Sequence, residues 1–167
     1  MKRLLFLSLY IGIIVCSGTS YAIPGKLDPS FGNGGIAIAA KSSSRPIEVV
    51  GVEVQASTPF RHSLAAGRIV TVDVKPTLAD GLAGNLDPDT TTFDLIRRLV
   101  DRMAVISEPQ LQQAVAGLLR QERVIAEGAG ATGVAGVLGS ALETRGRRIA
   151  VVVSGANIDI DTLMSII

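Results

Sequence analysis

Residues 148–157 read Arg148-Ile-Ala-Val-Val-Val-Ser-Gly-Ala-Asn157, an apolar run followed at once by a small polar turn. An apolar run without alternation predicts a strand that is buried on both faces, as in a parallel sheet. Ile47-Glu-Val-Val-Gly-Val-Glu-Val54 is β-branched and mostly apolar, and it predicts a second strand of the same kind. Each of the two strands is therefore expected to lead through a polar loop into a helix.

Helical and extended patterns alternate along the rest of the chain. The apolar residues from 93 onward recur at helical spacing, and Ser107-Glu-Pro-Gln110 is a capping box with proline in the first turn. The expected helices cover residues 36–41, 60–66, 91–103, 107–119 and 127–142, with a short one after residue 157. The expected strands cover residues 47–54, 69–74, 104–106 and 148–153. This alternation predicts an α/β fold with an open, mostly parallel sheet and flanking helices.

The composition limits the class of protein. With 167 residues the chain is about one domain long. Sixteen Lys and Arg against 15 Asp and Glu give a net charge of +1, so charge offers no argument for a nucleic-acid partner. The single cysteine excludes a disulfide scaffold and a cysteine-based metal cluster.

The N-terminus has the pattern of an export signal. Lys2 and Arg3 precede an apolar run from Leu4 to Val15, and small polar residues follow up to Ala22. The run is shorter than the roughly twenty residues that a membrane-spanning helix needs. We therefore expect residues 1–22 to be a signal peptide, cleaved after Ala22, and the protein to be exported to the periplasm or secreted. A buried or anchoring helix is the alternative.

Residues 23–35 are rich in Pro, Gly, Asp and Asn and are expected to be a linker before a domain over residues 36–167. Ligands of open parallel sheets bind at the carboxyl ends of the strands, which here are followed by Ser154–Asn157 and Glu53–Thr58. A hydroxyl at such a position can bond a heteroaromatic nitrogen, and a neighbouring glycine lets a planar ring approach the backbone. The alternative is an ordinary turn with Ser154 as a helix cap.

Four segments together resemble one enzyme family: Val50-Gly-Val-Glu53, Thr77-Leu-Ala-Asp-Gly-Leu-Ala83, Ala126-Glu-Gly-Ala-Gly-Ala131 and Val151-Val-Val-Ser-Gly-Ala-Asn157. In order and spacing they are similar to the C-terminal half of the fold-type II pyridoxal-phosphate enzymes of the threonine dehydratase and serine racemase group. The resemblance covers residues 36–167 and implies part of that catalytic domain. It also implies pyridoxal phosphate as cofactor, a small amino acid as substrate, and deamination of L-threonine or L-serine to a 2-oxo acid and ammonia.

The resemblance also implies roles for individual residues. Ser154 matches the family serine that hydrogen-bonds the pyridine nitrogen of the cofactor, and Gly155 and Asn157 belong to the same turn. Gly81 matches the glycine whose backbone lies against one face of the pyridine ring. Glu127 matches an acid close to the cofactor pocket; a helix N-terminal charge favoured by the helix dipole is the alternative.

Glu53 and Ser57 are the candidate metal residues, because Glu53 matches a carboxylate that binds a divalent cation in some family members. Pro59 stands where those members have a second acid, which weighs against a metal site. The alternative for Glu53 is a solvated charge at a strand end.

Two departures from the family pattern decide the functional expectation. The Schiff-base lysine of the family lies in a Ser-Phe-Lys motif before this region, and none of the lysines, Lys2, Lys26, Lys41 and Lys75, has that context. Asp28-Pro-Ser-Phe31 occupies the place of the family's phosphate cradle. We therefore assign no catalytic residue and expect a truncated dehydratase-like protein that is inactive alone.

Two other hypotheses remain open at this stage. The chain could be one half of a split lyase whose other half carries the lysine, or a secreted, non-catalytic binding or oligomerisation module. The missing strands would leave a sheet face and edge exposed. We therefore expect the partner to be either a polypeptide equivalent to the missing N-terminal half or a second copy of this chain.

Overall fold

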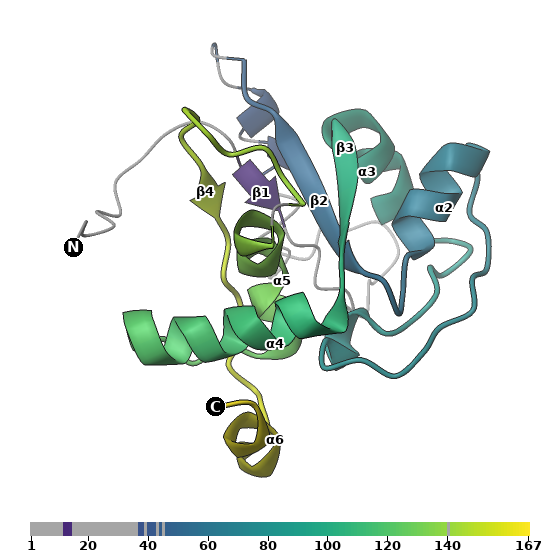
Figure 1. Cartoon of the computed structure of the whole chain (residues 1–167). Coiled ribbons are helices and arrows are strands. Elements are labelled where there is room, and N and C mark those ends of the chain that lie inside the picture. Colours follow the sequence, from purple (N-terminus) through teal and green to yellow (C-terminus); the bar gives the residue numbers. More distant parts are fainter. Residues whose placement is uncertain (1–11, 15–36, 39, 43, 45, 140) are drawn as a thin grey trace.

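The computed structural model describes residues 12–14, 37–38, 40–42, 44, 46–139 and 141–167. Four parallel strands form one sheet in the order β3-β2-β1-β4 (Figure 1). The strands are β1 (Gly12–Ile14), β2 (Val49–Val54), β3 (Arg102–Ile106) and β4 (Ala150–Val151). The α/β class and the parallel sheet predicted from the apolar runs are confirmed.

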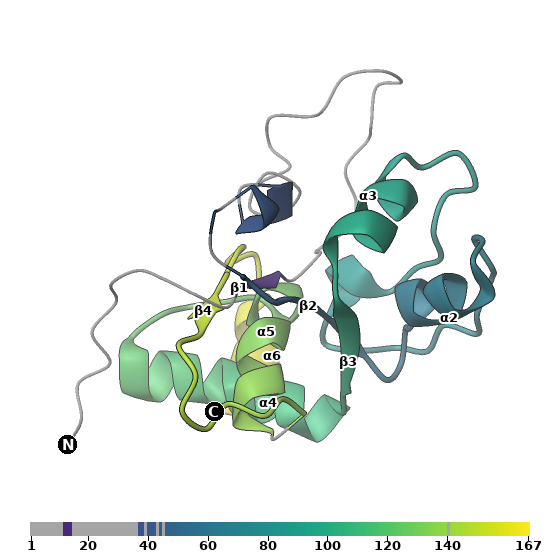
Figure 2. The same cartoon turned by 90° about the horizontal axis from the view of Figure 1, so that it is seen from above.

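Helices cover the sheet on both sides. They are α2 (Pro59–Ala66), η1 (Asp80–Leu82), α3 (Thr92–Leu99), α4 (Glu108–Gly117), η2 (Leu118–Glu122), α5 (Gly128–Leu138) and α6 (Ile160–Ile166). Seen from above, α4, α5 and α6 lie on one side of the sheet and α3 on the other (Figure 2). The capping box at the start of α4 is present, as the sequence predicts.

Side chains along β2 point alternately to the two faces of the sheet, and each face has its own hydrophobic cluster. Val50, Val52 and Val54 belong to the larger cluster, which includes the apolar residues of α4 and α5. Val49 belongs to a smaller cluster with Ala37. All six residues of β2 are buried, which is what a strand covered on both faces requires.

The predicted strand over residues 69–74 is wrong. This segment is extended but pairs with no strand among the described residues. Its backbone is held by side chains instead, because Val70 N donates to Ser63 Oγ at 3.1 Å and Val72 N donates to Asn85 Oδ1 at 2.7 Å. Alternating burial here comes from one face lying against the protein and the other facing solvent.

Several element boundaries also differ from the predictions. The helix expected to reach Met103 ends at Leu99, and Met103 belongs to β3. The helix expected to end at Leu142 ends at Leu138. The strand expected over residues 148–153 is reduced to Ala150–Val151, which pairs with β1.

Gly12–Ile14, within the apolar run of the predicted signal peptide, forms β1 between β2 and β4. The rest of residues 1–22 and the whole predicted linker, 23–35, lie outside the described residues. Within the part of the chain that is described, no helix has the length and apolar character to cross a membrane.

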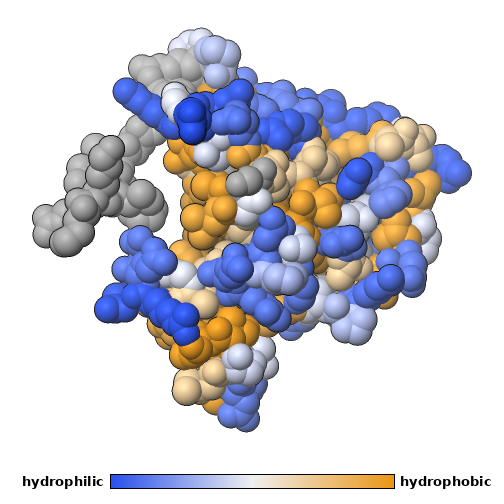
Figure 3. All heavy atoms as spheres, viewed as in Figure 1, coloured by the Kyte–Doolittle hydropathy of each residue, from blue (hydrophilic) through white to orange (hydrophobic). Residues whose placement is uncertain are grey.

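Apolar side chains remain exposed on the surface. Figure 3 shows an apolar patch interrupting the polar surface at the end of the molecule that carries α6. On α6, Ile160 is 64% exposed and Met164 62%, and Leu138 at the end of α5 is 64% exposed. These side chains form apolar surface that the described part of the chain leaves uncovered.

Candidate functional site

Three segments meet where the parallel strands end, and we call them the carboxyl-edge site. They are residues 77–82, which include η1; residues 127–130, which begin α5; and residues 154–157, which follow β4. The first turn of α5 contacts the other two segments. The carboxyl edge is where open parallel sheets bind their ligands.

Small residues make this contact possible. A Cβ atom at Gly128 would overlap the Leu78 carbonyl, and one at Gly130 would overlap the Ser154 carbonyl. A Cβ at Gly81 would lie 3.3 Å from the Cβ of Ala129. The small residues at the start of α5 therefore allow the Gly81 turn and the Ser154 turn to pack on the same end of this helix.

Ser154 carries an unsatisfied polar atom. Its Oγ is buried and has no hydrogen-bond partner among the described residues, and it is the one buried side-chain polar atom there of which this holds. Leaving a buried hydroxyl unpaired costs about 1–3 kcal/mol. The structure thus presents an unpartnered hydroxyl at the position that the resemblance assigns to a bond with a pyridine nitrogen.

Glu127 holds the turn that carries Ser154. Its Oε2 accepts a hydrogen bond from Asn157 N at 3.1 Å, and its backbone N donates to Gly155 O at 3.2 Å. Gly155 has a φ of 78°, and a Cβ there would overlap the Glu127 carboxylate. The structure therefore brings Ser154, Gly155, Asn157 and Glu127 together, with the Glu127 carboxylate directed at the backbone of the turn.

Glu108 belongs to the site but was not predicted. It follows β3 by two residues, and its carboxylate accepts hydrogen bonds from Thr77 Oγ1 at 2.7 Å and from Leu78 N. The sequence interpretation treated residues 107–110 only as a helix cap. A carboxylate just past the end of a parallel strand was the available signal, since that position faces the ligand edge.

Glu53 and Ser57 have hydrogen-bond partners within the protein. Both carboxylate oxygens of Glu53 accept backbone N–H bonds from the start of α2, Oε1 from Phe60 at 2.8 Å and Oε2 from Arg61 at 3.0 Å. Ser57 Oγ donates to Gly84 O at 3.3 Å. No group of three or more metal-ligating side chains occurs among the described residues. The carboxylate of Glu53 serves as an anchor for α2, favoured by the helix dipole.

Burial of Glu53 has a consequence for stability. Burial raises the pKa of Glu53 from 4.5 to about 6, although the N–H groups of Arg61 and Phe60 oppose the rise. Between these pH values the folded state binds more protons than the unfolded state, so the free energy of unfolding falls as the pH increases. We expect wild type to lose roughly 2 kcal/mol more than Glu53→Gln between pH 4 and pH 7, measured by denaturant unfolding.

The exposed Glu122→Gln variant is the control for this measurement and should follow wild type. Equal pH slopes in wild type and Glu53→Gln would show that Glu53 titrates normally.

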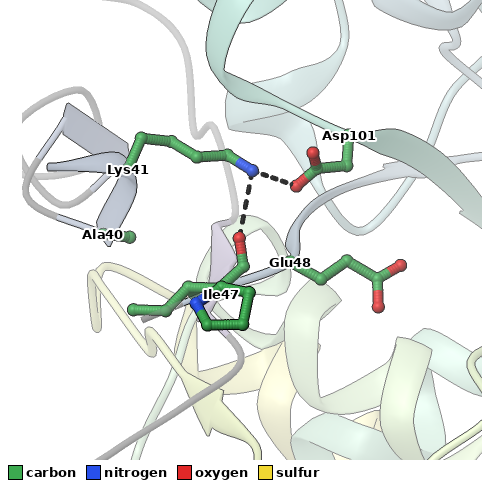
Figure 4. Close-up of a pocket in the computed structure, with 6 residues that line it drawn as sticks. Ala40, Lys41, Ile47, Glu48 and Asp101 are labelled. Atoms are coloured by element: carbon green, nitrogen blue, oxygen red, sulfur yellow. Dashed lines mark hydrogen bonds and ion pairs between the residues drawn. The ribbon is translucent and has the colours of Figure 1, made fainter. Parts of the chain in front are cut away.

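A large open cleft lies away from the carboxyl-edge site. It has a volume of about 500 Å³ and is lined by Lys41, Asp101 and the residues at the start of β2 (Figure 4). Lys41 Nζ lies 2.5 Å from Asp101 Oδ2 and donates to Ile47 O at 3.0 Å. Burial acts to raise the pKa of Asp101, but the bonds from Lys41 and Val49 N outweigh it and hold that pKa below its ordinary value. Lys41 is therefore committed to a structural ion pair at the amino end of β2, opposite the carboxyl-edge site.

Comparisons with known proteins show the family. A family model described as "Pyridoxal-phosphate dependent enzyme" matches residues 31–155. The L-threonine ammonia-lyase of Thermotoga maritima is 41% identical over 133 residues, which are 80% of this chain and 33% of that protein. The catabolic L-threonine dehydratase of Escherichia coli K12 is 32% identical over 151 residues, 87% of this chain and 46% of that protein.

Solved structures of serine racemase and threonine deaminase have a similar fold. Maize serine racemase superposes with a TM-score of 0.69 at 30% identity, covering 79% of this chain and 41% of that one. The threonine deaminase of T.th. superposes with a TM-score of 0.67 at 35% identity, covering 76% of this chain and 46% of that one. The chain thus spans less than half the length of these relatives.

Proposed function

The chain belongs to the family of pyridoxal-phosphate dependent enzymes, and we propose that its carboxyl-edge site holds the pyridine ring of that cofactor without turning over substrate alone. Its relatives of known activity include ammonia-lyases that act on threonine. We propose that the chain is a truncated form of such a threonine or serine ammonia-lyase. The observation that carries the proposal is the buried, unpartnered hydroxyl of Ser154 at the end of β4.

Each residue of the site has a separate role in the proposed binding of the cofactor. Ser154 Oγ is free to donate a hydrogen bond to the ring nitrogen, and a neutral donor there leaves that nitrogen largely unprotonated. The backbone at Gly81 offers a flat surface without a side chain to one face of the ring. Glu127 keeps the Ser154 turn in place through Asn157 N. When bound, pyridoxal phosphate withdraws electrons from the α-carbon of an amino acid.

Neither lysine of the described part has the Ser-Phe-Lys context of the family's anchoring lysine. Lys41 is also paired with Asp101 at the other end of β2. The family resemblance places the anchoring lysine in the half that this sequence does not match. We therefore propose binding without turnover.

Equilibrium dialysis of the full chain against pyridoxal phosphate tests this function. We expect measurable binding, about tenfold weaker binding for Ser154→Ala because a hydrogen bond in a buried site is lost, and no ammonia from threonine. Ser165→Ala removes an exposed hydroxyl on α6 that bonds only Thr162 O, and it should bind as wild type does. Turnover by wild type that Ser154→Ala abolishes would overturn the proposal.

The chain matches less than half the length of its relatives, and this favours a second candidate function. In that case the chain is one half of a split lyase. The exposed apolar residues of α6 and α5 supply surface for a polypeptide that carries the missing half. A homo-oligomer or a secreted binding module would use the same surface. Ammonia release that appears only on mixing with a lysine-bearing half identifies the split enzyme, and light scattering of the chain alone identifies the oligomer.

Export is a further proposal, carried by Lys2, Arg3 and the apolar run after them. Cleavage after Ala22 would remove β1 and leave β2 and β4 without the strand between them. N-terminal sequencing of the accumulated protein decides the matter: Ile23 as the first residue supports export with cleavage, and Met1 contradicts it.

A further inference from the structure

We propose that Glu108 is a positioning residue for the cofactor ring: it sets the wall of the site formed by residues 77–82. The inference rests on the proposed function. Glu108 does not face the ring itself; it acts through the backbone that carries Gly81.

The carboxylate of Glu108 holds two adjacent residues of this wall. One oxygen accepts the hydroxyl hydrogen bond of Thr77 at 2.7 Å, and the other accepts Leu78 N–H. Thr77 Oγ1 accepts in turn from Ala79 N at 3.1 Å. The three successive residues 77–79 are therefore fixed to a single side chain, which itself stands on the first turn of α4.

The segment held in this way determines where Gly81 lies. Leu82 N donates to Ala79 O at 2.8 Å, which closes the η1 turn directly after Ala79. Ala79 is fully buried, and the backbone at Leu78 packs so closely on α5 that Gly128 has no room for a Cβ. A shift of residues 77–79 would therefore move Gly81 relative to α5 and to the Ser154 turn that α5 contacts.

The chemistry requires a carboxylate. Thr77 Oγ1 and Leu78 N are both donors, so two acceptor oxygens are needed on the side chain that meets them. A glutamine would satisfy one donor and present an NH₂ group to the other. Glu108→Gln thus disturbs the wall without changing the size of the side chain.

Glu48→Gln is the matched control. Glu48 also accepts two hydrogen bonds, from Arg102 Nε at 2.6 Å and from Arg147 Nη1 at 2.6 Å, but it lies at the amino end of β2. A general loss of stability would affect both variants, whereas a loss of positioning would affect only Glu108→Gln. Thr77→Val removes the hydroxyl that relays the bond to Ala79 and serves as a second variant.

We would measure pyridoxal-phosphate binding by equilibrium dialysis and amide hydrogen exchange of the full chain. Glu108→Gln and Thr77→Val are expected to weaken binding about tenfold and to speed exchange at residues 78–82, while Glu48→Gln binds as wild type does. Three results would each overturn this inference but leave the proposed function standing. They are equal cofactor binding by wild type and Glu108→Gln, unchanged amide exchange at residues 78–82, and the same loss of cofactor binding in Glu48→Gln. If wild type binds no cofactor, the proposed function fails and the inference falls with it.

Discussion

Gly130→Ala is expected to destabilise the protein by about 3 kcal/mol, because the added methyl group would overlap the Ser154 carbonyl. Neither neighbour yields easily: Gly130 lies in the first turn of α5, and the Ser154 turn is tied to Glu127 at both its Gly155 and Asn157 ends. The strain is relieved only by separating α5 from the segment after β4. The same movement would displace the Ser154 hydroxyl, so cofactor binding should fall with stability.

Thermal unfolding checks this expectation, and a loss of about 3 kcal/mol should lower Tm by roughly 10 °C in a domain of this size. Gly117→Ala is the matched control. Gly117 is also helical, but a Cβ there meets nothing within 4 Å, so the substitution should stabilise the protein by about 0.5–1 kcal/mol. If Gly130→Ala retained the Tm and the cofactor affinity of wild type, the close contact of α5 with the Ser154 turn would be disproved.

Local sequence patterns were sufficient to predict those elements that are buried along their whole length or held by bonds between near neighbours in the sequence. Residues 49–54 of the apolar run over 47–54 form β2 and are all buried, so the unbroken apolar stretch was enough to predict this strand. The capping box at residues 107–110 identified the start of α4, because the bonds that make it lie within four residues.

Contacts between distant residues caused the errors. The start of β3 depends on Asp101, which accepts Val49 N at 2.6 Å and pairs with Lys41, and neither partner is near it in the sequence. Helical spacing of apolar residues continued to Met103 although the backbone had turned into the sheet. The extended segment before Lys75 alternates like a strand, but no strand neighbour exists for it among the described residues.

The site residues also divide into those that local sequence patterns predicted and those that depend on contacts between distant residues. Ser154, Gly155 and Asn157 lie within four residues of the sequence, so one motif predicted that they lie together. Glu108 was missed because its partner Thr77 lies 31 residues away, and only the fold brings the two together. The metal prediction at Glu53 rested on one matching carboxylate, and the N–H groups of α2 that occupy both its oxygens could not be inferred from residue types.

A chimera should show the catalysis that we propose the chain lacks alone. We expect threonine ammonia-lyase activity when residues 37–158 replace the matching segment of the Thermotoga maritima L-threonine ammonia-lyase, to which this chain is 41% identical over 133 residues. The recipient then supplies everything before the graft, including the residues that stand in place of Asp28–Phe31. The graft supplies the Ser154 hydroxyl, the Gly81 wall and the glutamates that hold them.

Ammonia release from threonine should be undetectable for the native chain and substantial for the chimera. Within the chimera, Ser154→Ala should lower kcat/KM by tenfold or more, since a buried donor to the cofactor is lost. Ser63→Ala, which alters a buried serine that bonds Val70 at the far side of α2, should act on stability alone. A chimera that folds and binds pyridoxal phosphate but releases no ammonia would mean that the carboxyl-edge site of this chain does not provide the catalytic geometry. Activity in the chimera would show that residues 37–158 are competent for catalysis, because these residues are common to the native chain and the chimera.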